Sequence, residues 1–116
     1  MQRYSKSKFT EKNTMIIYNT TFSVPTELQN KFLDFIRNEY IPLSTQNHVM
    51  KEPRLTRVFS KDDNGDASYA LEFKSDTIEA LEEWNKTVGR KLYFLITTRF
   101  GQNIQGFATL LQPIDL

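Results

Sequence analysis

The stretch MIIYNTTFSV, residues 15–24, alternates as a β-strand does when one of its faces lies in a core. The side chains that point to one side of this strand are Ile16, Tyr18, Phe22 and Val24. Met15 and Ile17 are also apolar, but they point to the other side, where a surface strand would meet water. The stretch therefore predicts a strand whose second face is covered as well, and the downstream elements indicate how.

Periodicity and turn signals predict two helices and three further strands after this first strand. The expected elements are a helix at 27–40, strands at 54–60 and 67–73, a second helix starting after Asp76, and a strand at 105–112. Pro42 is expected to end the first helix, because the residue before a proline avoids the α region. Gly89 is expected to kink or split the second helix. Asn64-Gly65 supplies the positive-φ residues of a tight hairpin turn between the two middle strands.

The order βαββαβ predicts an α+β, ferredoxin-like fold, in which an antiparallel sheet carries both helices on one face. Right-handed connections place the first and third strands in the centre. The helix-free face would then expose an apolar patch, which a second copy of the chain is the simplest way to cover. The expected homodimer interface contains Met15, Ile17, Val58 and Ala70, with Ala108 or Leu110 from the last strand.

Composition and charge narrow the class of protein. The chain has 116 residues, enough for one domain, and no cysteine, so disulfides and thiolate metal sites are excluded. Residues 1–14 hold four basic side chains against one acidic one, and we expect them to be a disordered or variable extension before a single domain at 15–116. The rest of the chain is mildly acidic, which disfavours nucleic-acid binding. With no apolar run of membrane-spanning length, we expect a soluble, cytoplasmic protein without a membrane partner.

Four fragments resemble a known family when taken together. They are MIIYNTTFSV at 15–24, NEYIP at 38–42, SYALEF at 68–73 and RFGQNIQGFATLL at 99–111. This set is similar to the uncharacterised bacterial family called domain of unknown function 4286, and the likeness runs from Met15 to about Leu111. The resemblance implies a fold similar in outline to dimeric α/β-barrel proteins and supplies no catalytic residue. Many members carry a histidine before the Ile-Pro pair, where this chain has Tyr40, which argues against a mechanism that needs an imidazole there.

Metal and catalytic patterns are weak in this chain. His48 is the single histidine and has no second ligand or carboxylate cluster beside it in the sequence, so it is interpreted as a solvated loop residue. The acidic run Asp62, Asp63 and Asp66 lacks the twelfth-position glutamate of a calcium loop. We expect neither a metal nor a cofactor. The favoured function is a non-catalytic small-ligand-binding or accessory module, and the alternative is a cofactor-independent oxygenase or isomerase of the dimeric α/β-barrel type.

A candidate ligand site follows from the polar side chains expected on the helix-covered face of the sheet. The expected members are Arg57, Tyr18, Thr20, Tyr69 and Thr109, with Tyr40 and Arg99 approaching from the helices. Arg57 would give this pocket one permanent positive charge with five N–H donors, which suits a carboxylate or another small anion. The competing interpretation places Arg57 on an edge strand with its head in water.

Overall fold

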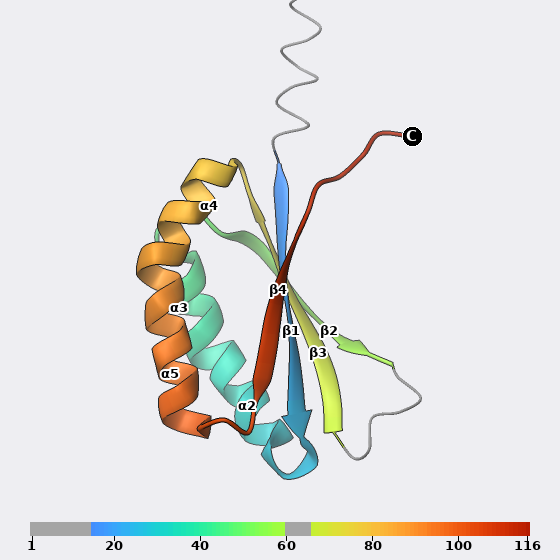
Figure 1. Ribbon diagram of the computed structural model, residues 1–116, viewed down its shortest axis with the longest axis vertical. Helices are drawn as coiled ribbons and strands as arrows, with labels where there is room; N and C mark the ends of the chain where they lie inside the picture. Colours follow the sequence, from blue (N-terminus) through green and yellow to red (C-terminus); the bar gives the residue numbers. More distant parts are fainter. Residues whose placement is uncertain (1–14, 60–65) are drawn as a thin grey trace, which may run out of the picture.

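The computed structural model describes residues 15–59 and 66–116, which form a four-stranded antiparallel sheet with helices on one side (Figure 1). The strands are β1 (Ile16–Pro25), β2 (Lys51–Val58), β3 (Asp66–Ser75) and β4 (Gln105–Leu111). Their order in the sheet is β2-β3-β1-β4, so the first and third strands are central. The predicted α+β, ferredoxin-like βαββαβ fold is confirmed.

The first helical segment is longer than predicted. It runs through a 3₁₀ turn η1 (Thr26–Leu28), α2 (Gln29–Phe35), a π-helical turn η2 (Ile36–Tyr40) and α3 (Ile41–Thr45). The prediction that Pro42 ends the helix is wrong, since Ile41 keeps helical angles of φ −63° and ψ −47°. The N–H of Ile41 bonds to the carbonyl of Ile36, five residues back, and this wider turn gives the proline ring room within the helix.

The second helical segment comprises α4 (Ile78–Trp84), a π-helical turn η3 (Asn85–Gly89) and α5 (Arg90–Phe100). It begins at Thr77, whose side-chain oxygen accepts a hydrogen bond from the N–H of Ala80 at 3.1 Å. The expected irregularity near Gly89 is present, as a π-helical turn within a continuous helix. No helix within residues 15–59 and 66–116 is both long and apolar enough to cross a membrane.

The core lies between the helices and the two central strands. Along β3, every side chain that faces the helices is buried and its neighbours are partly exposed, as the period of a half-buried strand requires. Aromatic rings dominate this layer, and they meet edge-on, as in the pairs Phe22 with Phe32 and Phe35 with Phe100. Burying these rings, together with the aliphatic side chains around them, removes apolar surface from water and stabilises the domain.

The register of β4 corrects one part of the sequence prediction. In the pairing of β1 with β4, Ala108 lies opposite Thr20 and Thr109 lies opposite Asn19. Ala108 therefore faces the helices, as does Leu110, and both were expected on the helix-free face. Phe107 and Thr109 face away from the helices, which is the reverse of the prediction. The predicted Asn64-Gly65 turn and the extension at 1–14 fall outside the described residues.

Candidate functional site

A cleft of about 690 Å³ separates α5 and η3 from strands β1 and β4, on the helix-covered side of the sheet. It exists because the helix-facing side chains of β4 are small at its middle, where Gly106 and Ala108 leave space beneath the helix. The lining residues are Tyr18, Thr20, Phe22, Tyr40, Trp84, Asn85, Gly89, Tyr93, Ile96, Thr97, Gly101, Gln102, Ile104, Gln105, Gly106, Phe107 and Ala108. These 17 residues combine aromatic walls with hydroxyl and amide groups.

None of the described residues that line this cleft carries a formal charge. Their polar groups are hydroxyls and side-chain amides. The described lining contains no Asp, Glu, Lys, Arg or His side chain. A neutral, largely aromatic wall accommodates an uncharged organic molecule and disfavours an ion, since an unpaired charge loses its hydration there.

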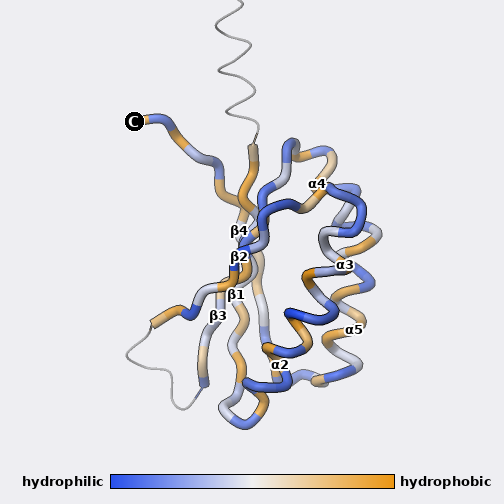
Figure 2. Tube along the Cα trace, turned by 180° about the vertical axis from the view of Figure 1, so that it is seen from behind, coloured by the Kyte–Doolittle hydropathy of each residue, from blue (hydrophilic) through white to orange (hydrophobic). Residues whose placement is uncertain are grey.

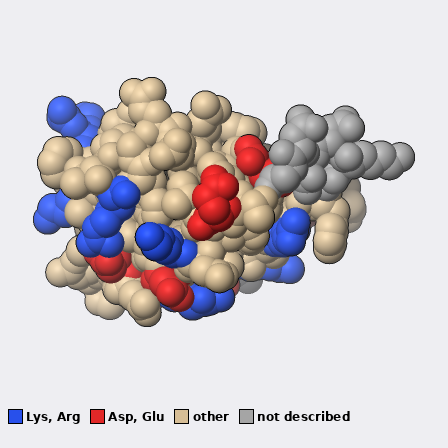
Figure 3. All heavy atoms as spheres, turned by 90° about the horizontal axis from the view of Figure 1, so that it is seen from below, with Lys and Arg blue, Asp and Glu red and all other residues tan. Residues whose placement is uncertain are grey.

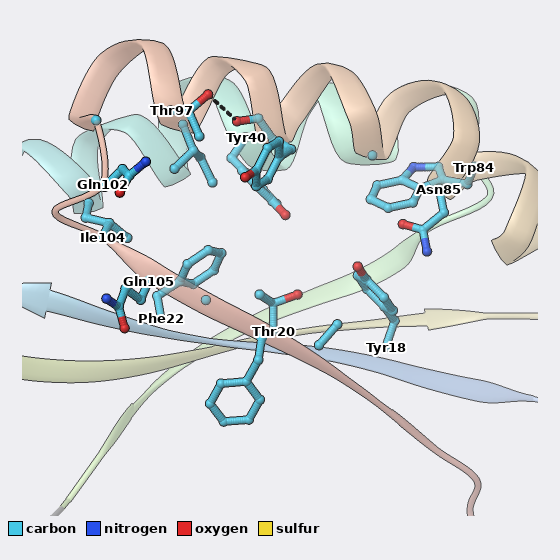
Figure 4. A pocket seen from close by; sticks show the side chains of 17 residues that line it. Tyr18, Thr20, Phe22, Tyr40, Trp84, Asn85, Thr97, Gln102, Ile104 and Gln105 are labelled. Atoms are coloured by element: carbon cyan, nitrogen blue, oxygen red, sulfur yellow. Dashed lines mark hydrogen bonds between the residues drawn. The ribbon is translucent and has the colours of Figure 1, made fainter.

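The two walls of the cleft are aligned by aromatic contacts (Figure 4). The wall on the sheet side consists of β1 residues, namely Tyr18, Thr20 and Phe22. The opposite wall, on the helix side, contains Tyr40 and Trp84. The rings of Tyr18 and Trp84 meet edge-on at 5.7 Å between centroids. Trp84 is 1% exposed, and its indole N–H donates to the carbonyl of Ser44 at 3.0 Å, which fixes the ring. This end of the cleft is therefore rigid.

Gly89 and the π-helical turn around it shape the same end of the cleft. A Cβ atom at Gly89 would lie 2.8 Å from the Asn85 side-chain oxygen and 3.2 Å from the Trp84 ring. Only glycine lets these two side chains keep their positions. Asn85 directs its amide into the space above Tyr18 (Figure 4). The π-helical turn η3 thus gives the cleft a donor and acceptor group, the Asn85 amide.

Tyr18 and Tyr40 are the two titratable groups with shifted pKa values in the cleft. Burial raises the pKa of Tyr18, and a hydrogen bond with the Thr20 side chain offsets part of the rise. Burial also raises the pKa of Tyr40, and the nearby Tyr18 adds to the shift. Both hydroxyls stay protonated through the neutral pH range and present O–H groups, so neither can serve as a base there.

The structure brings together only part of the predicted site. Tyr18, Thr20 and Tyr40 line the cleft. Tyr69 faces the helices but lies outside the cleft, and its hydroxyl donates to Gln29 Oε1 at 3.1 Å. Thr109 is on the opposite face of the sheet. The sequence reasoning missed Trp84, Asn85 and Gly89, whose positions depend on how the second helix crosses the sheet.

The two predicted arginines do not reach the cleft. Arg57 is exposed on the edge strand β2, opposite Tyr69, so the cleft lacks the positive charge that was expected to bind an anion. Arg99 forms two 2.6 Å hydrogen bonds to the Glu39 carboxylate, and its guanidinium carbon lies 5.4 Å from the centre of the Phe35 ring. This pair holds the pKa of Glu39 below its usual range and ties η2 to α5.

The helix-free face holds the four residues expected at a dimer interface. Ala70 lies opposite Thr21 of β1 and Thr56 of β2, and Ile17 and Val58 share this face by strand alternation. Met15 precedes β1 with the same parity. Phe107 and Leu111 of β4 also point this way and are 66% and 46% exposed. Figure 2 shows this side of the sheet turned away from the helices, with hydrophobic segments along its strands.

Charges outside the cleft are mixed in sign. In the view of Figure 3, basic and acidic side chains alternate across the described part of this surface and do not gather into a patch of one sign. His48 is exposed, and its backbone has a positive φ of 65°. Among the described residues, no three His, Asp or Glu side chains are grouped as a metal site would need.

Comparison with known proteins identifies a family and a fold. A family model described as Domain of unknown function (DUF4286) matches residues 15–114. No curated protein sequence matches the chain. A dimeric ferredoxin-like protein from an uncultured marine organism has a TM-score of 0.60 at 11% identity, covering 89% of this chain and 98% of that one.

Two further solved structures have similar folds and named activities. One is a Caulobacter crescentus protein provisionally described as an antibiotic biosynthesis monooxygenase, with a TM-score of 0.63, 14% identity, and coverage of 95% of this chain and 99% of that one. The other is a hydroxynitrile lyase from Passiflora edulis, with a TM-score of 0.63, 14% identity, and coverage of 87% and 95%. At such low identity these likenesses show the fold alone.

Proposed function

The chain belongs to the family Domain of unknown function (DUF4286), and from this premise we propose that it is a homodimeric module that binds a small, uncharged, ring-containing molecule. The observation that carries this proposal is the 690 Å³ cleft, whose described lining is aromatic and polar but bears no charge. A pocket of this size, mostly apolar and with a few directed polar groups, has the make-up of a small-molecule site.

Binding without catalysis fits the groups in the cleft better than an enzymatic reaction does. Proton abstraction near pH 7 needs a base that is unprotonated there, usually a histidine or a carboxylate. The titratable groups that line the cleft are tyrosines, and burial raises the pKa of both Tyr18 and Tyr40. They can donate a hydrogen bond to a ligand but cannot remove its proton.

A cofactor-independent enzyme is the second candidate, and it draws on the likeness to proteins described as a monooxygenase and a hydroxynitrile lyase. It requires a ligand that is itself easily ionised or oxidised, because the cleft offers only proton donors. Incubating a bound ligand with the protein in air and following it by mass spectrometry separates the two candidates. Turnover would favour the enzyme, and an unchanged ligand favours the binding module.

The homodimer is proposed through the helix-free face of the sheet. This face carries Ile17, Val58, Phe107 and Leu111, apolar side chains that a second sheet would cover. A structural neighbour is described as a dimeric ferredoxin-like protein. Light scattering after gel filtration should give twice the 13.6 kDa chain mass. Ile17→Lys should produce a monomer, because an unpaired ammonium is costly to bury. A parent protein of 13.6 kDa would contradict the dimer.

Trp84 makes the cleft directly testable, because it is the single tryptophan of the chain and lines the cleft. Its fluorescence is titrated with tetralin and other uncharged compounds of one to three fused rings. Each compound is matched with a carboxylated analogue, such as 1,2,3,4-tetrahydro-2-naphthoate for tetralin. We expect saturable changes with the neutral compounds and at least about tenfold weaker binding of the carboxylates. No saturable change, or tighter binding of the carboxylates, would overturn the proposal.

A further inference from the structure

Tyr40 is a largely buried residue that lines the cleft, and its hydroxyl has no protein partner among the described residues. Its side chain is 6% exposed, and the hydroxyl forms no hydrogen bond with any residue that the structure describes. Two other polar side chains of this layer are paired, whereas the fully buried Ser44 hydroxyl has no partner in the described part of the chain. The hydroxyl of Tyr69, a residue 7% exposed, donates to Gln29, and the indole N–H of Trp84 donates to Ser44. Because Tyr40 lines the cleft and its hydroxyl has no described protein partner, the hydroxyl is available to form a hydrogen bond with a bound ligand.

The backbone holds Tyr40 in this position by an unusual local structure. Tyr40 is the last residue of the π-helical turn η2. Such turns are rare in proteins, and those that occur are often at functional sites. Its ring is fixed edge-on by Phe22 at 6.0 Å and by Phe35 at 6.2 Å between centroids. The ring therefore has little freedom to turn its hydroxyl toward another protein group. Tyr40 lines the cleft from the helix side (Figure 4).

Tyr18 supplies a second hydroxyl from the opposite wall. It rises from β1 toward the helices, and its ring is held by Trp84. Tyr18 and Tyr40 line the same cleft from opposite walls (Figure 4). With both hydroxyls protonated, the cleft presents two O–H donors between aromatic rings. A carbonyl oxygen has two lone pairs and can accept from both donors at once.

We propose that Tyr40, assisted by Tyr18, binds the carbonyl oxygen of an uncharged ring ketone and so selects ketones over hydrocarbons of the same shape. The inference rests on the proposed function, since it assigns a ligand class to the same cleft. The aromatic side chains hold the ring of the ligand, and the two hydroxyls orient it. Tyr40 is thus a specificity-determining residue that makes no contribution to holding the fold through its hydroxyl.

The test compares ring compounds that differ only in the carbonyl group. Tetralin with 1-tetralone, and fluorene with 9-fluorenone, are titrated into the full chain by isothermal calorimetry. The parent protein, Tyr40→Phe and Tyr18→Phe are measured side by side. Tyr69→Phe is the matched control, because it removes a hydroxyl from the same layer that has a protein partner and lies outside the cleft.

The expected result is a ketone affinity about tenfold above that of the matched hydrocarbon in the parent and in Tyr69→Phe. This advantage should disappear in Tyr40→Phe and shrink in Tyr18→Phe, with hydrocarbon affinity unchanged. Equal binding of ketone and hydrocarbon to the parent, or an advantage that persists in Tyr40→Phe, overturns the inference and leaves ligand binding in the cleft intact. Failure of every compound to bind overturns both the inference and the proposed function.

Discussion

Strands β3 and β4 flank the same central strand, yet they are packed in opposite ways. The five side chains of β3 that face the helices are all buried, whereas every residue of β4 is exposed. Both strands pair with β1 over most of its length. The difference lies in the side chains at the middle of the strands, because β3 directs Tyr69 and Leu71 at the helices where β4 directs Gly106 and Ala108. One side of β1 thus stabilises the fold, and the other side leaves room for a ligand.

Substitutions on β3 should lower the free energy of unfolding more than equivalent substitutions on β4. Leu71→Ala on β3 removes a side chain that is 1% exposed and should lower the free energy of unfolding by about 3 kcal/mol. Leu110→Ala on β4 removes one that is 53% exposed and should cost less than about 1 kcal/mol. Urea unfolding at one protein concentration measures both variants. Equal losses would contradict the assignment of the core to the β3 side.

On the β4 side, a larger side chain in the cleft should weaken ligand binding. Ala108→Phe puts a ring under α5, where Ala108 lines the cleft, and should weaken tetralin binding about tenfold or more by occupying its space. Thr109→Phe is the matched control, because the adjacent position faces away from the helices. Calorimetry measures both variants. Unchanged affinity in Ala108→Phe, or an equal loss in Thr109→Phe, would place the ligand elsewhere.

Removing one hydroxyl on each side of β1 should change stability by different amounts. Tyr69→Phe on the β3 side breaks a hydrogen bond to Gln29 and should lower the free energy of unfolding by about 1 kcal/mol. Tyr40→Phe in the cleft removes an unpaired hydroxyl and should leave stability within about 0.5 kcal/mol of the parent. Thermal unfolding of the three proteins at matched concentration provides the test. A larger loss in Tyr40→Phe than in Tyr69→Phe would mean that the Tyr40 hydroxyl holds the fold.

The smallest expected effect concerns pH. The pKa values of Tyr18 and Tyr40 in the folded state lie above the unfolded value of 10. Below pH 10 both tyrosines are protonated, and their contribution to the free energy of unfolding is complete. That contribution is lost as the pH rises above 10 through the folded pKa values. Ketone affinity should therefore vary by less than about twofold between pH 6 and 9, as calorimetry at several pH values can measure. A tenfold change in this range would require another titrating group in the cleft.

The parts of the molecule that could be predicted from the sequence depend on local patterns. The alternation in β1 placed Tyr18 and Thr20 on the helix-covered face, and the order of elements gave the sheet topology. The prediction of which β4 residues face the helices was wrong, because GFATLL has apolar residues at both odd and even positions. Alternation therefore cannot distinguish the two faces of this strand. Arg57 is exposed on the edge strand β2, which agrees with the competing interpretation of the sequence and leaves it outside the cleft.

The rest of the site depends on structure beyond single elements. The π-helical turn η2 has no signature in the sequence, and it carries a helix through Pro42 against the usual preference. At η3, Gly89 indicated an irregularity but not its π-helical form. The cleft itself arises from where α5 crosses the sheet, which side-chain packing decides. Gly106 and Ala108 were the available signal, since small residues at alternate positions of a strand leave space on one face.

The central claim is that a ligand enters between β4 and α5 and avoids the packed side of the sheet. The most direct measurement is a two-dimensional amide NMR titration of the isotopically labelled chain with 1-tetralone. The account predicts that the shifted signals cluster at Thr20, Gly89, Gly106 and Ala108, which line the cleft, while those of β2 stay in place. Shifts concentrated on β2 and β3, or on residues of the helix-free face, would contradict it.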